Sequence, residues 1–380
     1  MNGRRQFIQK LLALGATTTA SYSGLSWANT TFSATNSTGV VLDDLFLKHT
    51  MKGHPESAER LIAIDRALEK RDLWNQLSPV AARMAKNEEL RWAHSQTYID
   101  EIEHLSQTHV GYYDPYHEDT YINAASFDAA RTAAGAAIEL NLAVYDRKVD
   151  NGFALLRPPG HHALKDKAMG FCIFNSDVIA ARALQQYRGI KRVAIVDFDV
   201  HHGNGTQDMT INDPSIMAVS IHQHPYWPLT GGMEWVGEGE AKGTNVNCPF
   251  LRDAGDKTYL KAFNEIIYPK LKAFKPQHII VFAGYDGHWR DPLAQHLVSV
   301  DGYNQLVNRL KQTAQELCDG RLSLSLGGGY DVETLGHCVT GSMQVLLGQT
   351  PTADPLGPSP DKERDFSKHL KELKAVHKTA

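Results

Sequence analysis

Short apolar runs alternate with amphipathic segments over most of the chain after residue 150. The runs are rich in β-branched residues and too short for buried helices, so each is predicted to form a strand. Strands that alternate with helices predict an α/β fold, with a mainly parallel sheet flanked by helices on both faces. The predicted strands lie within 153–158, 192–199, 216–222, 278–286 and 321–331, and the predicted helices are 176–188, 257–273 and 301–318.

The first third of the chain is predicted to add two helices. Residues 54–71 begin as a loop and continue as an amphipathic helix, and residues 125–145 form an alanine-rich helix that can pack closely on a sheet. The stretch between them, 111–123, is aromatic and acidic, and we predict a surface loop there.

Polar segments flank the predicted domain, which spans residues 40–348. Residues 29–39 lack large apolar groups and are predicted to be a flexible lead-in. Residues 349–380 form a proline-rich linker and a charged helix, whose apolar side is expected to pack on the body rather than bind a partner. That side consists of Phe366, Leu370, Leu373 and Val376.

The N-terminus has the features of an export signal. Arg4 and Arg5 precede a weakly apolar stretch, and Ser26 and Ala28 supply small residues for cleavage. Residues 1–28 are therefore predicted to be a twin-arginine signal peptide, and the protein is expected to be periplasmic or secreted. A plain basic N-terminus on a cytoplasmic protein is the alternative.

Composition excludes several classes of partner. The 380 residues are 42% hydrophobic and 22% charged, with a formal net charge of −4, so no basic excess indicates nucleic acid. Outside the signal, no apolar run reaches the ~18–20 residues of a membrane span. The cysteines are widely spaced and form no zinc or redox motif, and the sequence assigns no disulfide among them. They are Cys172, Cys248, Cys318 and Cys338.

Acidic and imidazole groups follow the buried run 193–196. If the strand stays extended, Asp197, Asp199 and His201 share one face, and Asp199 and His201 can bind one cation. A carboxylate with a neutral imidazole suits Zn²⁺, with Fe²⁺ or Mn²⁺ as alternatives. Taken alone, the motif is equally consistent with a solvated loop.

Three more predicted strands end in polar or glycine-rich motifs, and the carboxyl ends of parallel strands meet at one edge of a sheet. Asp286 is then a third ligand, unless it caps the next helix, and three protein ligands leave an open catalytic position. His161 and His162 follow Pro-Pro-Gly and offer a base near neutral pH. Tyr330 follows three glycines and offers a hydroxyl to a developing oxyanion.

Together these motifs resemble those of the zinc-dependent histone deacetylase family, in its class II and bacterial branch, which includes acetylpolyamine amidohydrolases. The similarity covers about residues 54–348 and rests on HPE, RPPGHHA, GFCIFN, DFDVHHGNGTQ, SIH, AGYDGHWRDPL and LGGGYD. It implies an arginase-like fold with a central eight-stranded, mainly parallel sheet.

The resemblance also implies two ion sites. One Zn²⁺ would be bound by Asp199, His201 and Asp286. A structural K⁺ would be bound by oxygen atoms of Asp197, Asp199, His201, Ser220 and Ile221.

The same resemblance implies separate roles for the tandem histidines. His162 resembles the general base and then acid, whereas His161 is an electrostatic partner oriented by Asp197. Asn204 stands where class I members carry an aspartate, and the loss of that charge is expected to lower the pKa of His162. Tyr330 would polarise the substrate carbonyl together with zinc.

The resemblance places a substrate tunnel around five residues. Gly170 and Phe171 would line it, with the Gly170 carbonyl accepting the substrate amide N–H, and Trp227 or Tyr226 would form the opposite aromatic wall. Leu293 stands where a polyamine-selective relative carries a gating glutamate. Because leucine cannot attract a cationic amine, this residue favours acyl-lysine as the substrate.

We therefore predict a zinc-dependent amidohydrolase that removes acetyl, lactyl or other short acyl groups from lysine ε-amines of proteins or peptides. The same chemistry on an acylpolyamine is the alternative. A non-catalytic acyl-lysine binding module and an arginase-like manganese hydrolase are the other readings. The sequence leaves the oligomeric state open, a homo-oligomer included.

Overall fold

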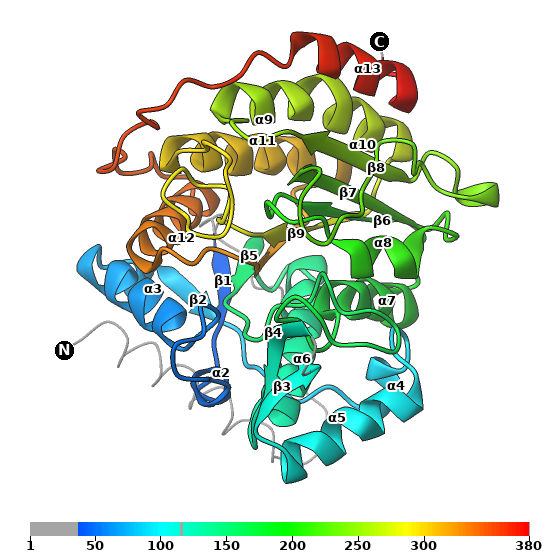
Figure 1. The fold of residues 1–380 in the computed structure, drawn as a ribbon, viewed down its shortest axis with the longest axis vertical. Coiled ribbons are helices and arrows are strands. Elements are labelled where there is room, and N and C mark those ends of the chain that lie inside the picture. The colour runs from blue at the N-terminus through cyan, green and yellow to red at the C-terminus, as the bar shows by residue number, and fades with distance from the viewer. Residues whose placement is uncertain (1–36, 115–116, 380) are drawn as a thin grey trace, which may run out of the picture.

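The structure is a computed structural model that describes residues 37–114 and 117–379 around a central eight-stranded sheet (Figure 1). The strand order is β2-β1-β5-β10-β9-β6-β7-β8, and every neighbouring pair is parallel. This confirms the predicted α/β fold. The sheet strands are β1 (Thr38–Val41), β2 (Leu77–Pro79), β5 (Asn151–Ala154), β6 (Val193–Asp197), β7 (Ile216–Gln223), β8 (Asn245–Phe250), β9 (His278–Ala283) and β10 (Leu322–Leu326).

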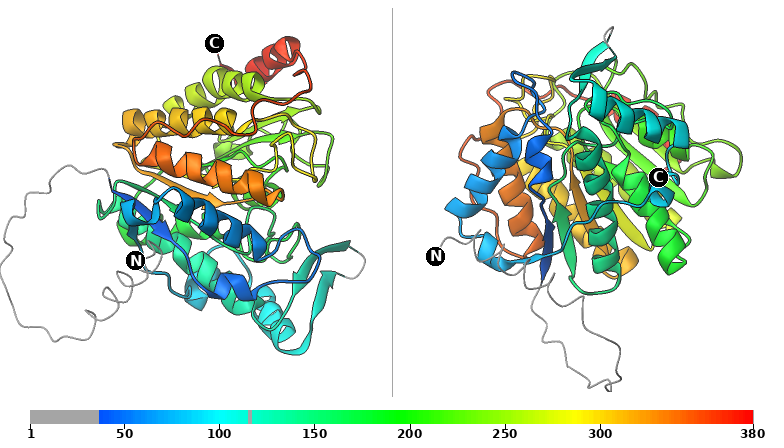
Figure 2. Two further views of the ribbon diagram at one scale, coloured as in Figure 1. Left: turned by 90° about the vertical axis from the view of Figure 1, so that its left-hand side faces the viewer. Right: turned by 90° about the horizontal axis from the view of Figure 1, so that it is seen from below.

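Helices cover both faces of the sheet, as predicted (Figure 2). Helices α6 and α7 pack together on one face, and α3, α12 and α11 cover the other. The helices are α2 (Leu45–Lys48), α3 (Glu59–Lys70), α4 (Asn87–Leu90), α5 (Gln96–Thr108), α6 (Ser126–Tyr145), α7 (Ser176–Arg188), α8 (Asn204–Thr210), α9 (Asp256–Ala262), α10 (Tyr268–Phe274), α11 (Val300–Cys318), α12 (Val332–Leu346) and α13 (Ser367–His377). Shorter turns are η1 (Trp74–Gln76), η2 (Gly239–Ala241) and the π-helical η3 (Phe263–Ile267), which joins α9 to α10.

The segment predicted as a surface loop at 111–123 is instead a β-hairpin. Strands β3 (Gly111–Asp114) and β4 (His117–Ile122) pair antiparallel. Tyr121 and Ile122 are buried at its end. The prediction was wrong because aromatic residues favour strands as well as exposed loops, and the burial of these two side chains comes from distant packing.

The ends of the domain also differ slightly from the prediction. Strand β1 begins at Thr38, within the expected lead-in, because the Thr38 hydroxyl donates to Asn151 of β5 at 2.9 Å. The predicted C-terminal helix is α13, which begins at Ser367. Before it, the carboxylate of Glu363 accepts hydrogen bonds from the backbone N–H groups of Gly255 and Thr258 at the start of α9. The apolar side of α13 does pack on the body, as predicted, with Leu370 and Leu373 buried.

Other sequence-based predictions have mixed outcomes. The four cysteines are buried free thiols, so they form no disulfide. Among the residues that the structure describes, none of the helices has both the length and the apolar character that crossing a bilayer requires. The predicted signal at 1–28 lies outside the described residues.

One buried carboxyl group should make stability depend on pH. Asp177, near the start of α7, is 3% exposed; it accepts a hydrogen bond from Ser325 at 2.7 Å, and its Oδ1 has no partner among the described residues. Burial raises the pKa of Asp177 to about 7, although the Ser325 hydroxyl opposes this shift. When the pKa of a carboxyl group is higher in the folded than in the unfolded state, the free energy of unfolding falls as the pH rises from the unfolded-state pKa to the folded-state pKa.

We therefore expect Asp177→Asn to flatten the pH dependence of the melting temperature. Between pH 5.5 and 8, ionisation of Asp177 should lower the free energy of unfolding of the wild type by about 2 kcal/mol, and its melting temperature by roughly 4–8 °C. The melting temperature of the variant should not show this decrease. Thermal melts at both values measure it. Asp146→Asn is the control, because its hydrogen bonds to Arg188 hold the pKa of Asp146 below this range. An unchanged decline in Asp177→Asn would refute the assignment.

Candidate metal and catalytic site

The site begins where β6 ends, at the carboxyl edge of the sheet. The strand stops at Asp197, so the condition for strand alternation, an extended chain through His201, is not met. The Asp199 N–H donates to Asp197 Oδ1 at 2.9 Å, and the His201 N–H donates to Asp199 Oδ1 at 3.0 Å. These hydrogen bonds fold the chain into a turn. The turn, rather than strand alternation, brings Asp199 and His201 together.

Three ligand atoms converge at this turn. Asp199, His201 and Asp286 each offer one atom, and these atoms lie within 4.8 Å of one another. His201 Nδ1 is 3.0 Å from Asp286 Oδ2 and 3.3 Å from Asp199 Oδ1. Backbone N–H groups orient both carboxylates: Gly328 donates to Asp199 at 2.8 Å, and Val200 to Asp286 at 2.9 Å.

The electrostatics of this triad favour a cation. Burial lowers the pKa of His201, but hydrogen bonds and charges of Asp199 and Asp286 raise it overall to about 10. Burial, and then the charge of Asp199, raise the pKa of Asp286 to about 7. Two buried carboxylates beside one imidazole thus need positive charge, which a divalent metal supplies. A carboxylate and imidazole ligand set fits Zn²⁺ and leaves coordination positions open.

The tandem histidines lie beside the triad with different partners. His161 Nδ1 is 2.7 Å from Asp197 Oδ2, and His162 Nδ1 is 2.7 Å from the side-chain oxygen of Asn204. An amide oxygen only accepts, so His162 Nδ1 carries the proton and its Nε2 can accept one. The ring of Phe282 stacks on His161 with centroids 4.1 Å apart.

These surroundings shift the pKa values of the two imidazole rings in opposite directions. Burial, and then the positive charges of His161 and His201, hold the pKa of His162 well below its usual range. Burial also opposes charge on His161, but the charges of Asp197 and Asp199 raise its pKa overall. The surroundings therefore favour the neutral form of His162 and stabilise the protonated form of His161.

A pocket of about 240 Å³ is lined by His201 of the triad and by His162. The four predicted substrate residues, Gly170, Phe171, Trp227 and Leu293, line it, and Tyr226 lines it as well. The Trp227 ring stands edge-on to His162 with centroids 4.6 Å apart. The lining residues are Asp119, His162, Gly170, Phe171, His201, Tyr226, Trp227, Leu293 and Tyr330.

Tyr330 reaches the pocket from the loop after β10. Its N–H donates to Asp291 Oδ2 at 2.6 Å, and the guanidinium of Arg60 lies 5.1 Å from its ring centre. Arg60 also donates to the carbonyls of Gly327 and Gly329, the latter at 2.8 Å. Burial, and then the charge of Asp286, raise the pKa of Tyr330 well above its usual range, so the phenol remains a hydrogen-bond donor.

Sequence reasoning missed three residues around this site. Arg60 is buried and bonded at 3.1 Å to Glu56, four residues earlier and before α3 begins, and this pair of opposite charges within HPESAER was the available signal. Asp119, in the hairpin that was predicted to be a loop, accepts the Gly170 N–H at 3.1 Å. Asp291 was passed over because only the folded chain shows that it holds Tyr330 in place.

Residues of the implied potassium site lie at the same sheet edge. Asp197 and Ser220 are partners in the register of β6 and β7, and Ile221 follows Ser220 on β7. The Ser220 hydroxyl is 2.9 Å from His222 Nδ1.

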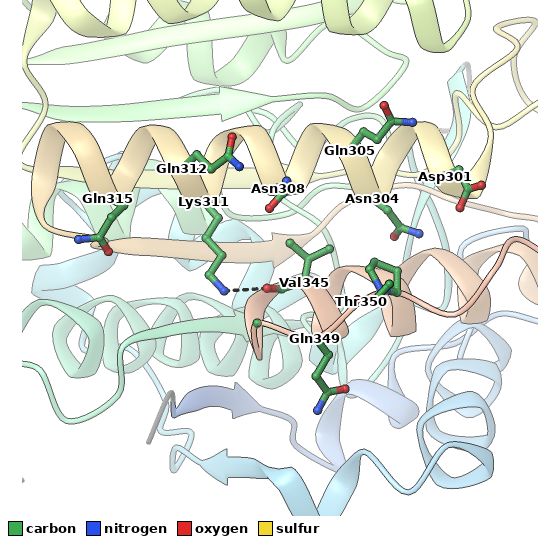
Figure 3. A pocket seen from close by; sticks show the side chains of 12 residues that line it. Asp301, Asn304, Gln305, Asn308, Lys311, Gln312, Gln315, Val345, Gln349 and Thr350 are labelled. Atoms are coloured by element: carbon green, nitrogen blue, oxygen red, sulfur yellow. Dashed lines mark hydrogen bonds between the residues drawn. The ribbon is translucent and has the colours of Figure 1, made fainter. Parts of the chain in front are cut away.

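A larger cavity, about 640 Å³, runs along α11 beside the end of α12 (Figure 3). Amide side chains dominate its lining, among them Asn304, Gln312 and Gln349. Lys311, which also lines this cavity, donates to the carbonyls of Val345 and Leu346 at 2.8 and 2.9 Å, so its ammonium group caps the C-terminal end of α12. The groups that suit catalysis lie in the smaller pocket.

Comparisons with known proteins agree with this geometry. A histone deacetylase domain model matches residues 54–346. Histone deacetylase 14, chloroplastic, of Arabidopsis thaliana is 38% identical over 321 residues, which cover 80% of this chain and 75% of that protein. The histone deacetylase-like amidohydrolase of Pseudomonas aeruginosa is 34% identical over 306 residues, 80% of either chain.

The structural comparison extends this similarity to the fold. The crystal structure of the HDA15 HD domain matches with a TM-score of 0.82 and 35% identity, covering 90% of this chain and 95% of that one. Histone deacetylase 15 of Arabidopsis thaliana is 38% identical over 329 residues, and the matched region spans 58% of its length.

Proposed function

We propose that this chain, which belongs to the histone deacetylase family, is a zinc-dependent hydrolase that removes short acyl groups from lysine ε-amines of peptides or proteins. Membership of the family supports the coarser assignment, an amide hydrolase that acts on acetylated substrates. One observation carries the proposal: His201, which converges with Asp199 and Asp286, lines the same pocket as His162 and Tyr330.

The roles of the side chains follow from their geometry. A zinc ion held by the triad supplies Lewis acidity, which polarises a carbonyl group and acidifies water. His162 Nε2 takes a proton from the attacking water, and the Tyr330 hydroxyl donates to the developing oxyanion. Asp197 stabilises the protonated form of His161, and in that form His161 would stabilise the same negative charge. His162 then returns the proton to the amine as the C–N bond breaks, which leaves the free amine and the carboxylic acid. Transfer of the remaining proton of the water from the acid to the amine gives the carboxylate and the ammonium group.

The pocket walls support acyl-lysine as the substrate. Phe171, Trp227 and Leu293 present apolar surface that suits the four methylene groups of a lysine side chain. The alternative, an acylated polyamine, is favoured by Asp119, whose carboxylate lines the same pocket and could pair with a second ammonium group. Only the polyamine carries this second ammonium group, so a direct comparison of turnover on the two substrate classes distinguishes them.

Turnover of matched substrates tests the proposal. The zinc-loaded protein should hydrolyse acetyl-, lactyl-, butyryl- and trifluoroacetyl-lysine peptides with higher kcat/KM than acetylputrescine or acetylspermidine. Turnover of the acetylated polyamines alone would establish the alternative. If the protein turns over neither class and only binds the peptides, it is a binding module.

Two further parts of the proposal come from sequence motifs. We propose that potassium is bound by Asp197, Asp199, His201, Ser220 and Ile221, since the parallel register brings β6 and β7 side by side there. We also propose export through the twin-arginine route, which the paired arginines at 4–5 support. An exported enzyme would act on surface or extracellular acyl-lysine.

A further inference from the structure

A tight turn carries Phe171, one of the apolar residues of the pocket lining. Met169 and Cys172 pair across this turn, and the Cys172 N–H donates to the Met169 carbonyl at 2.9 Å. The two central residues, Gly170 and Phe171, have φ angles of +56° and +67°. Positive φ suits glycine, but it is unfavourable for phenylalanine, because the Cβ atom crowds the backbone in this conformation. Contacts from outside the turn must therefore hold Phe171 in place.

The hairpin strand β4 supplies these contacts. The Phe171 N–H donates to the Thr120 hydroxyl oxygen at 2.9 Å, and the Gly170 N–H donates to Asp119 Oδ2 at 3.1 Å. The Thr120 hydroxyl in turn donates to Asp119 Oδ1 at 2.8 Å. Thr120 is 2% exposed, so water has little access to replace its hydroxyl. Two adjacent side chains of β4 thus bind the two successive N–H groups of the turn.

The turn also packs closely on the catalytic side of the pocket. The His54 ring stands edge-on to the Phe171 ring with centroids 4.7 Å apart. A Cβ atom at Gly170 would lie 2.3 Å from the His162 ring and 2.5 Å from the Trp227 ring. A shift of this backbone would therefore change the apolar surface that Phe171 presents to the lysine chain.

We propose that Thr120 is a positioning residue for substrate binding, whose hydroxyl holds Phe171 in its left-handed conformation and so keeps the ring in the pocket wall. This inference rests on the proposed function. The hydroxyl acts through Phe171 and touches no reacting atom. The wall contacts the lysine chain equally in the bound substrate and in the transition state, so loss of the hydroxyl should weaken binding and spare the chemical step.

The test is Thr120→Val, which keeps the shape of the side chain and removes the hydroxyl. On an acetyl-lysine peptide we expect KM to rise about 3- to 10-fold, as for the loss of one neutral hydrogen bond, with kcat within about twofold of the wild type. Thr120→Ala also lacks the hydroxyl and should give the same rise. Thr120→Ser keeps the hydroxyl and should have a KM within about twofold of the wild type.

Thr340→Val is the matched control. Thr340 is buried, but its hydroxyl donates to the Gly336 carbonyl within α12 at 2.7 Å, and the residue is not part of the pocket lining. This variant should leave KM unchanged.

The route through Phe171 is tested in a second background. Phe171→Gly lacks the ring and adopts positive φ without strain, so adding Thr120→Val to it should change KM little further. Fully additive effects of the two substitutions would overturn the proposal.

The possible failures are distinguishable. A wild type that hydrolyses no acyl-lysine peptide would refute the proposed function and this inference with it. An active wild type, together with an unchanged KM in Thr120→Val, would overturn this inference alone. A loss in kcat without a rise in KM, or a serine variant as impaired as the valine variant, would also overturn it.

Discussion

Tyr330→Phe is expected to lower kcat by about 100-fold or more without unfolding the protein. The phenol is the donor that the pocket offers to a developing oxyanion, and removal of one such donor typically costs ~3–4 kcal/mol. Burial and the charge of Asp286 keep its pKa well above the usual range, so the hydroxyl holds its proton at neutral pH. Steady-state kinetics on an acetyl-lysine peptide measure the effect.

The ring of Tyr330 should stay in place in this variant. Its backbone N–H remains bonded to Asp291, and Arg60 still holds the carbonyls of the glycine loop. Zinc content and melting temperature should therefore match the wild type. Turnover within threefold of the wild type would remove Tyr330 from the mechanism.

His162→Ala is expected to reduce kcat/KM by about 10²- to 10⁴-fold, the usual contribution of a positioned base. Its Nδ1 is bonded to Asn204, which leaves Nε2 to take the proton from water. Burial and the neighbouring imidazoles hold the pKa of His162 well below its usual range. The wild type should thus keep its activity through neutral pH, and protonation of this base should reduce activity only at a pH well below the usual imidazole range.

His161→Ala provides the comparison for this prediction. His161 stabilises charge from beside the pocket but transfers no proton, so its loss should leave more activity than the loss of His162. A kcat/KM profile from pH 5 to 9 in both variants makes the distinction. If His162→Ala keeps near-normal activity at neutral pH, His162 is not the base.

The layered fold was predictable because it rests on local patterns. Apolar runs such as 193–196 and the amphipathic spacing of 301–318 fix the type of element, and parallel strands require helical crossovers. The hairpin at 111–122 was not predictable in this way. Its aromatic residues fit a strand or an exposed loop, and only contacts with distant residues decide between them.

The site was predictable as a set of residues but not as a geometry. The motifs around Asp199, His201 and Asp286 named the triad, since these residues follow strands that end at one edge of the sheet. The turn that actually aligns the ligands depends on backbone hydrogen bonds from Asp199 and His201. Arg60 and Asp119 were missed because they come from elements remote in sequence.

The central claim is that Asp199, His201 and Asp286 hold the zinc on which hydrolysis depends. The direct measurement is the zinc content of the purified protein and of Asp286→Asn, taken together with peptide turnover before and after chelation. The claim predicts one zinc per chain, loss of zinc and turnover in the variant, and recovery of the chelated wild type on adding Zn²⁺. Full turnover by the metal-free protein, or stoichiometric zinc in Asp286→Asn, would contradict it.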